Sequence, residues 1–246
     1  MSVIRLLATD MDGTFIGDDE AMFALWQALV DNDILLAFST GRHLKSIEDF
    51  YREKQAQRRA DACVCMVGTD IYIRRNGAYV LDQDWHQHIS ASWDKAAVEE
   101  ILHAIPEARM QDEQWQSPFK SSYYLEEDVA ERLAEIEHRL QEQGLQAKVV
   151  YSADKFLDLL PIRSGKGEAV RYLAQQLNVD TDNVVTSGDT GNDLDMMRGE
   201  LGFHGIAVGN AASELKAFTP PHVYHAQASF AAGILEGLRV HGWLKS

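Results

Sequence analysis

The most constraining feature of the chain is an apolar segment at residues 3–8, interrupted only by Arg5, that runs directly into a polar turn at residues 9–14. Apolar residues at consecutive rather than alternating positions are typical of a strand covered on both faces, as in a parallel sheet. In the helical stretch that follows, apolar residues recur at three- and four-residue spacing: Met22, Leu25, Trp26, Leu29 and Val30. This order predicts the first part of a β-α-β unit.

The same alternation of strand, polar turn and helix recurs further along the chain. Short strands are predicted at residues 34–38, 62–67, 184–189 and 206–208. Helices are predicted after the segment 164–167 and near the end of the chain, at residues 230–238. Strands that alternate with helices in this way favour a parallel sheet with helices packed against it.

Residues 85–159 follow a different pattern. Amphipathic helical stretches around residues 93–105 and 129–140 are each followed by a short β pattern, around residues 120–124 and 148–151. Two helix-plus-strand units in succession are typical of a small α+β domain. We therefore expect an α/β protein with a Rossmann-like parallel-sheet core formed by residues 1–84 and 160–246. An α+β cap, residues 85–159, is inserted into that core.

Composition narrows the class of protein. The chain has 246 residues, of which 46% are hydrophobic and 25% charged, and these are ordinary values for a globular protein. It carries a net charge of −15, which argues against binding to a nucleic-acid backbone. No apolar run reaches the roughly 18 residues of a membrane span. Acidic residues near the start exclude a secretory signal, and the two cysteines fit a reducing compartment, so we expect a cytoplasmic protein with no membrane or nucleic-acid partner.

Four polar motifs are predicted at one edge of the sheet. Ligands of open parallel α/β sheets bind beyond the carboxyl ends of the strands. The segments concerned are 10–14 (Asp-Met-Asp-Gly-Thr), 39–42 (Ser-Thr-Gly-Arg), 165–167 (Gly-Lys-Gly) and 188–193 (Gly-Asp-Thr-Gly-Asn-Asp). If the sheet forms, all four converge on one crevice.

That crevice would hold four carboxylates, from Asp10, Asp12, Asp189 and Asp193. Like charges disfavour one another's ionisation, so these groups need a counter-charge. Mg²⁺ is a suitable cation because it prefers one or two carboxylates together with water and phosphate oxygens. Lys166 supplies a second positive charge.

These groups suit phosphoryl transfer, which depends on positioning and charge stabilisation. The hydroxyl of Thr40 and the amide of Gly41 supply hydrogen-bond donors. Asp10, at the end of a strand, can attack phosphorus and form an aspartyl-phosphate. Asp12, two residues later on a turn, can act as general acid and then activate water. Gly13 lets the backbone bend close to the site.

The four motifs, in this order, resemble those of the haloacid dehalogenase superfamily of phosphatases, and the inserted domain is similar in position to the type IIB cap of that superfamily. Within it the chain is more closely similar to sucrose-phosphate phosphatases. The segments that carry this second resemblance are 66–72, 119–123, 157–167 and 226–236.

The resemblance implies roles for individual residues. Asp10 would be nucleophile and metal ligand, and Asp12 would be acid/base and give its backbone carbonyl to Mg²⁺. Asp189 would complete the metal site with support from Asp193. Phosphate would be bound by Thr40, Gly41, Lys166 and Asn192. Sugar would be bound by Thr69 and Asp70 from the core and by Lys120 and Ser122 from the cap.

The implied reaction is Mg²⁺-dependent hydrolysis of a sugar phosphate, sucrose 6-phosphate first among them, by a monomer that could work beside a sugar-phosphate synthase. Thr69-Asp70 stands where similar enzymes often have Ser-Glu, so the sugar stays open. The alternatives are glucosylglycerol-, mannosylglycerate- or trehalose-phosphate. A different class, a receiver-like signalling module that accepts a phosphoryl group on Asp10, would need neither Asp12 nor a cap.

Overall fold

The computed structural model describes residues 3–244. The chain divides into two compact units. One unit is formed by Met1–Leu81 together with Lys166–Ser246, and the other by Asp82–Gly165. The fold is α/β with a largely parallel sheet, as the sequence predicts. The predicted core ranges 1–84 and 160–246 include residues 1–2 and 245–246, which lie outside the described part of the chain.

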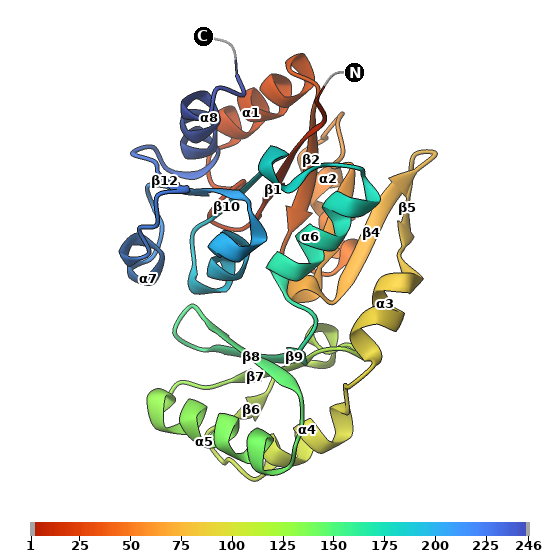
Figure 1. The fold of residues 1–246 in the computed structure, drawn as a ribbon, viewed down its shortest axis with the longest axis vertical. Helices are drawn as coiled ribbons and strands as arrows, with labels where there is room; N and C mark the ends of the chain where they lie inside the picture. The colour runs from red at the N-terminus through yellow and green to blue at the C-terminus, as the bar shows by residue number, and fades with distance from the viewer. Residues whose placement is uncertain (1–2, 245–246) are drawn as a thin grey trace. The chain divides into compact units, whose positions relative to one another are not determined.

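The first unit contains an eight-stranded sheet in the order β12-β11-β10-β1-β2-β3-β4-β5 (Figure 1). Its strands are β1 (Arg5–Thr9), β2 (Ile34–Ser39), β3 (Ala62–Cys65), β4 (Asp70–Arg75), β5 (Ala78–Leu81), β10 (Val184–Gly188), β11 (His204–Ala207) and β12 (Val223–His225). Neighbours from β12 to β3 pair in parallel, whereas β4 and β5 add an antiparallel hairpin at one edge. The parallel part is the Rossmann-like core.

Helices cover this sheet. They are α1 (Asp19–Asp31), α2 (Leu44–Glu53), α6 (Lys166–Gln176), α7 (Ser213–Ala217) and α8 (Phe230–Val240). Short 3-10 helices lie at η1 (Met66–Gly68), η3 (Thr181–Asn183), η4 (Gly191–Met197) and η5 (Gly199–Leu201). Helices α1, α2 and α8 share one hydrophobic cluster with the central strands, and Figure 1 shows α1 and α8 side by side.

Two predictions of local structure near β3 need correction. The strand predicted at residues 62–67 ends at Cys65, because Met66 and Val67 adopt positive φ values of 51° and 59°. The amide of Val67 then donates to the carbonyl of Thr40, so this turn is held against the loop that follows β2. The hairpin β4–β5 has no counterpart among the predicted strands, although its turn contains Asn76-Gly77, a common two-residue hairpin sequence.

Register explains why the polar motifs meet. Thr9 at the end of β1 pairs with Phe38 of β2 and with Ser187 of β10. The residues that follow these three strands therefore emerge at one edge of the sheet. The amide of Asp10 also donates to the carbonyl of Ser187 at 2.9 Å, which extends the pairing by one residue.

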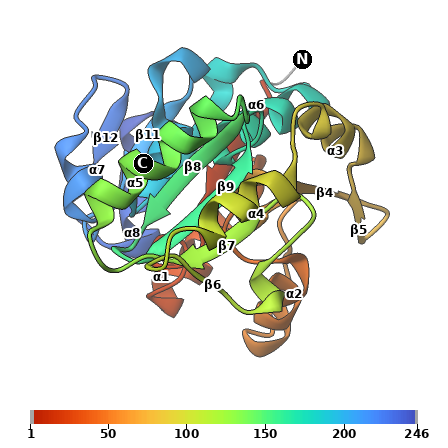
Figure 2. The ribbon, with the colours of Figure 1, turned by 90° about the horizontal axis from the view of Figure 1, so that it is seen from below.

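The second unit is a four-stranded antiparallel sheet in the order β6-β7-β9-β8 with helices on one face (Figure 2). Its elements are α3 (Gln83–Ser90), α4 (Lys95–His103), β6 (Arg109–Met110), η2 (Glu113–Trp115), β7 (Ser121–Tyr124), α5 (Val129–Glu142), β8 (Ala147–Ser152) and β9 (Phe156–Pro161). Side chains from α4, α5, β7 and β9 form its hydrophobic core. The unit has the α+β pattern and comprises Asp82–Gly165, whereas the sequence predicts the cap at residues 85–159.

No helix among residues 3–244 is long and apolar enough to cross a membrane.

The helix α1 offers a matched test of its packing. Leu29 is fully buried, whereas Val30, which the sequence pattern placed on the same apolar stripe, is 49% exposed. We expect Leu29→Ala to lower the free energy of unfolding by about 2–5 kcal/mol, because it leaves a cavity. Val30→Ala should change it by less than about 0.5 kcal/mol, because the residue is exposed and alanine favours helix. Urea denaturation measures both, and equal losses would contradict the packing described for α1.

Candidate active site

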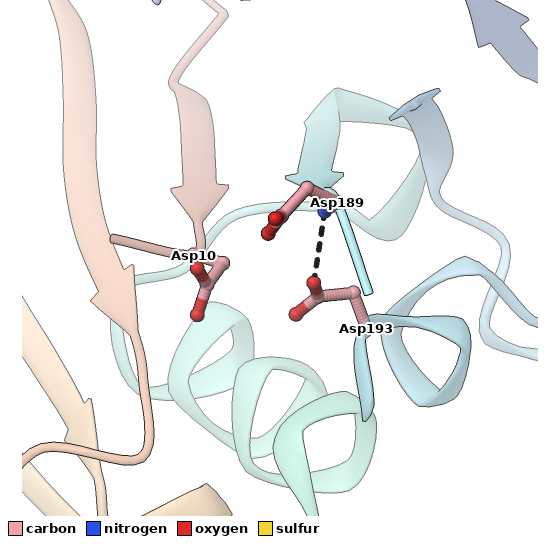
Figure 3. Close-up of side chains that lie close together, drawn as sticks. All are labelled: Asp10, Asp189 and Asp193. Carbon is pink, nitrogen blue, oxygen red and sulfur yellow. Dashed lines mark hydrogen bonds between the residues drawn. The ribbon is translucent and has the colours of Figure 1, made fainter. Parts of the chain in front are cut away.

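Three carboxylates gather at the carboxyl edge of the parallel sheet (Figure 3). Asp10 follows β1, Asp189 follows β10, and Asp193 lies in η4. Each offers an oxygen to a group whose atoms all lie within 4.8 Å of one another. The sequence predicted four carboxylates here, and the fourth, Asp12, has its side chain elsewhere.

Lys166 is the cation of this cluster. It is the first residue of α6 and only 1% exposed. Its Nζ donates to Oδ1 of Asp10 at 2.7 Å and to Oδ1 of Asp193 at 2.7 Å. A third hydrogen bond, of 3.2 Å, reaches Oδ1 of Asn192. An ammonium has three protons, so these bonds use all of them.

Asp193 is held from both sides. One of its oxygens faces Lys166, and the other accepts hydrogen bonds from the amides of Asp189 and Thr190, each at 3.0 Å. With Thr190 it forms a capping box at the start of η4. Both oxygens of Asp193 are therefore engaged, which leaves Asp10 and Asp189 as the carboxylates best able to take a ligand.

Gly13 and Asn210 shape the loop that follows Asp10. Gly13 has a φ of +81°, and a Cβ at this position would lie 2.3 Å from Oδ2 of Asp189. Glycine is thus required both for the turn and for the close approach. The carbonyl of Gly13 accepts a hydrogen bond from Nδ2 of Asn210 at 2.7 Å, and the hydroxyl of Thr14 donates to Oδ1 of Asp189 at 2.8 Å.

Burial dominates the electrostatics of the cluster. It raises the pKa of Asp10 to about 8, although Lys166 pulls that pKa down. It also raises the pKa of Asp189 to about 6, and the negative charge of Asp193 adds to the rise. Burial disfavours the charged form of Lys166 and so lowers its pKa. The negative charges of Asp10 and Asp193 outweigh this effect and raise the pKa above the ordinary value. One ammonium therefore does not offset three close carboxylates.

The donor set of the cluster fits a hard divalent cation. Oxygen ligands from one or two carboxylates are what Mg²⁺ prefers, and the remaining negative charge favours a cation of charge two. A second cation would oppose the rise in the pKa values of Asp10 and Asp189, which is caused first by burial and then by the neighbouring carboxylates.

Asp12 points to a different partner. Its carboxylate accepts two hydrogen bonds from Arg42, from Nε at 2.7 Å and from Nη2 at 2.5 Å. The side chain of Asp12 is 58% exposed and that of Arg42 is 25% exposed. The hydrogen bond to Asp12 is also the main cause that raises the pKa of Arg42. The side chain of Asp12 therefore lies outside the cluster formed by Asp10, Asp189 and Asp193.

Thr40 and Gly41 lie at the end of β2, next to Asp10 in the sheet. Thr40 is buried, and its hydroxyl oxygen accepts a hydrogen bond from the amide of Arg42 at 3.2 Å. The carbonyl of Arg42 in turn accepts from the amide of Met66 at 3.0 Å. Hydrogen bonds therefore fix the loop at residues 39–42 on both sides of Gly41.

The other two predicted core residues, Thr69 and Asp70, sit at the start of β4. The buried hydroxyl of Thr69 donates to the carbonyl of Met66 at 3.1 Å. Asp70 pairs with Cys65 in the antiparallel register of β3 and β4. Thr69 and Asp70 thus belong to the η1–β4 segment, which also holds the loop after β2.

In the second unit, Lys120 and Ser122, which the sequence predicted to bind sugar, both contact Asp158 of β9. The hydroxyl of Ser122 donates to Oδ1 of Asp158 at 2.5 Å, and Nζ of Lys120 lies 3.3 Å from the same oxygen. All three are at least nine-tenths buried. Their strand neighbours Tyr123 and Leu157 enter the core beneath the helices. Because strand side chains alternate, Ser122 and Asp158 lie on the face that α4 and α5 do not cover.

The sequence predicts no role for three residues that the structure places at these clusters. Arg42 belongs to a quoted motif, and its position after Gly41 was the available signal. Asp158 lies in the quoted segment 157–167, but nothing local pointed to its partner Ser122. Asn210 had no local signal, because its partner Gly13 is far away along the chain.

Comparison with known proteins gives one consistent answer. Over residues 3–242 the chain matches the family described as Sucrose-6F-phosphate phosphohydrolase. It is 34% identical to mannosylfructose-phosphate phosphatase of Agrobacterium fabrum, over 98% of each chain. It is 32% identical to sucrose-phosphatase 2 of Nicotiana tabacum, over 95% of this chain but only 58% of the tobacco protein.

A solved structure agrees. The sucrose-phosphatase of Synechocystis, determined in complex with sucrose and phosphate, superposes with a TM-score of 0.90 at 30% identity, covering 100% of both chains. Fold and strand-end cluster together define a phosphatase of the haloacid dehalogenase superfamily that hydrolyses phosphomonoesters. Within that superfamily, the chain belongs to the Sucrose-6F-phosphate phosphohydrolase family.

Proposed function

We propose that this phosphatase hydrolyses sucrose 6-phosphate to sucrose and phosphate through an aspartyl-phosphate on Asp10. The observation that carries the proposal is the buried Lys166, which holds Asp10 at the carboxyl edge of the sheet beside Asp189 and Asp193. The family match over nearly the whole chain supports the class of substrate.

Asp10 is the proposed nucleophile because one oxygen is fixed and the other is left to react. Lys166 holds Oδ1, so Oδ2 is the oxygen that attacks phosphorus. The bond from phosphorus to the sugar oxygen breaks, and Asp12 gives its proton to that leaving oxygen. Water then attacks the phosphorus, Asp12 takes a proton from the water, and the bond to Asp10 breaks to release phosphate.

Mg²⁺ is the proposed cofactor, held by the carboxylates of Asp10 and Asp189 and the backbone carbonyl of Asp12, with Asp193 in support. When bound, it would neutralise charge on the transferring phosphoryl group. Thr40 and Gly41 would donate hydrogen bonds to phosphate oxygens from their fixed loop. Lys166 would act on phosphate chiefly through its charge, because its three protons are shared with protein oxygens.

The buried polar cluster of the cap is the proposed sugar-binding element. Lys120, Ser122 and Asp158 lie on the sheet face that has no helix, and each is buried without being part of the hydrophobic core. Buried polar groups require hydrogen-bond partners, and sugar hydroxyls supply both donors and acceptors. The sugar-binding roles of Thr69 and Asp70 stay predictions.

The choice of sugar rests on the relatives. The Synechocystis protein was solved with sucrose and phosphate, and the Agrobacterium relative is a mannosylfructose-phosphate phosphatase. Sucrose and mannosylfructose are both disaccharides that contain fructose. Mannosylfructose phosphate is therefore the alternative substrate that most needs to be separated from sucrose 6-phosphate.

Asp10→Asn tests the nucleophile. An amide is a far weaker nucleophile than a carboxylate, and enzymes accelerate phosphate-monoester hydrolysis by up to about 10²¹-fold. We expect kcat for sucrose 6-phosphate to fall by several orders of magnitude while the circular-dichroism spectrum stays that of the wild type. Substantial phosphate release by the folded variant would remove Asp10 from its proposed role.

A substrate panel tests the specificity. We expect the highest kcat/KM for sucrose 6-phosphate among the phosphates of sucrose, mannosylfructose, trehalose, glucosylglycerol and mannosylglycerate. Chelation with EDTA should abolish activity on all of them, and added Mg²⁺ should restore it. Equal rates across the panel would contradict the sucrose assignment, and full activity in EDTA would contradict the cofactor.

A cap variant serves as the control for that panel. Asp158→Asn removes the charge that Lys120 and Ser122 share. It should raise KM for sucrose 6-phosphate and leave kcat/KM for p-nitrophenyl phosphate unchanged, because the aryl ester has no sugar. Asp154→Asn, at the turn between β8 and β9, should change neither.

A further inference from the structure

The pair formed by Arg42 and Asp12 is not explained by phosphate binding or by the metal cluster. Both donors of one edge of the guanidinium meet both oxygens of the carboxylate, at 2.7 and 2.5 Å. Exposed ion pairs generally contribute little to stability, so stability alone is a weak reason for this contact. Side-on pairing of this kind instead fixes the plane and the position of a carboxylate.

We propose that Arg42 is a positioning residue that holds Asp12 in place for its two proton transfers. This inference rests on the proposed function, in which Asp12 serves first as acid and then as base. Arg42 would act through Asp12 and would not itself touch the substrate.

The backbone around Arg42 is fixed before its side chain reaches Asp12. Its amide donates to the hydroxyl of Thr40, and its carbonyl accepts from the amide of Met66. The guanidinium therefore extends from a loop that is tied to both β2 and η1. Asp12, by contrast, lies on a turn and is more than half exposed, so its short side chain has little other packing to fix it.

The clamp leaves Asp12 able to work. A carboxylate offers about four acceptor sites on its two oxygens, and the fork of Arg42 occupies two of them. The other two positions, on a side chain that is 58% exposed, remain accessible, either to carry the proton that a leaving oxygen takes or to accept a proton from water. Misplacement of a reacting group by about 1 Å can cost about 10²-fold in rate, so losing the clamp should be measurable.

A double-mutant cycle separates positioning from other roles. With Mg²⁺ present, Arg42→Gln should lower kcat for sucrose 6-phosphate by about 10²-fold with little change in KM. In an Asp12→Asn background the same substitution should change kcat by less than about two-fold, because the group it positions is already lost. Arg42→Lys should stay within a few-fold of Arg42→Gln, because lysine keeps the charge but not the fork.

The leaving group supplies a second readout. Nitrophenolate departs without a proton, so Arg42→Gln should leave kcat/KM for p-nitrophenyl phosphate nearly unchanged. A role in phosphate binding or in folding would lower it. Arg52→Gln, which breaks a surface pair with Asp49 on α2, is the matched control and should behave as wild type on both substrates.

The outcomes distinguish the two proposals. Wild-type turnover by Asp12→Asn would overturn the acid–base role in the proposed function, and the inference with it. A slow Asp12→Asn variant combined with a fully active Arg42→Gln variant would overturn the inference alone. So would a further large loss when Arg42→Gln is added to Asp12→Asn, because Arg42 would then act independently of Asp12.

Discussion

The ammonium of Lys166 is the interaction on which the site depends. It is buried and bonds Asp10, at the end of the first strand, and Asp193, which is 27 residues further along the chain than the lysine itself. Removing one partner of a buried charge pair typically costs about 3–5 kcal/mol, because the other charge is left uncompensated. Lys166 is also the first residue after the inserted unit. Its ion pairs therefore link Asp10, from the part of the core before the insertion, to Asp193, from the part after it.

Hydrogen bonds between loops complete what the strands begin. Parallel register brings Asp10 and Asp189 to the same edge, but their side chains are oriented by residues of other loops. Thr14 holds Asp189, Asn210 holds the carbonyl of Gly13, and Arg42 holds Asp12. Because the strands fix the backbone and the loops fix the side chains, loop substitutions can change reactivity without changing the sheet.

The sequence predicts well what depends on local pattern. The sequence predicted strand β2 from a short apolar run, and it predicted the motif residues, Thr40 among them, at the end of that strand. What failed depends on tertiary contacts: Val30 matches the helical period but is exposed, and Met66 leaves the strand because its loop bonds to Arg42. The orientation of Asp12 toward Arg42 could not be predicted from the spacing within the motif, because Arg42 lies 30 residues further along the chain.

The central claim is that phosphate passes through a covalent bond to Asp10, and the stereochemical course at phosphorus tests it most directly. Hydrolysis of the thiophosphate analogue of sucrose 6-phosphate, made chiral at phosphorus by sulfur and two oxygen isotopes, in water of the third isotope gives chiral inorganic thiophosphate whose configuration can be determined. Two in-line displacements, first by Asp10 and then by water, predict net retention. Inversion would contradict the account, because it would mean that water attacks the substrate directly.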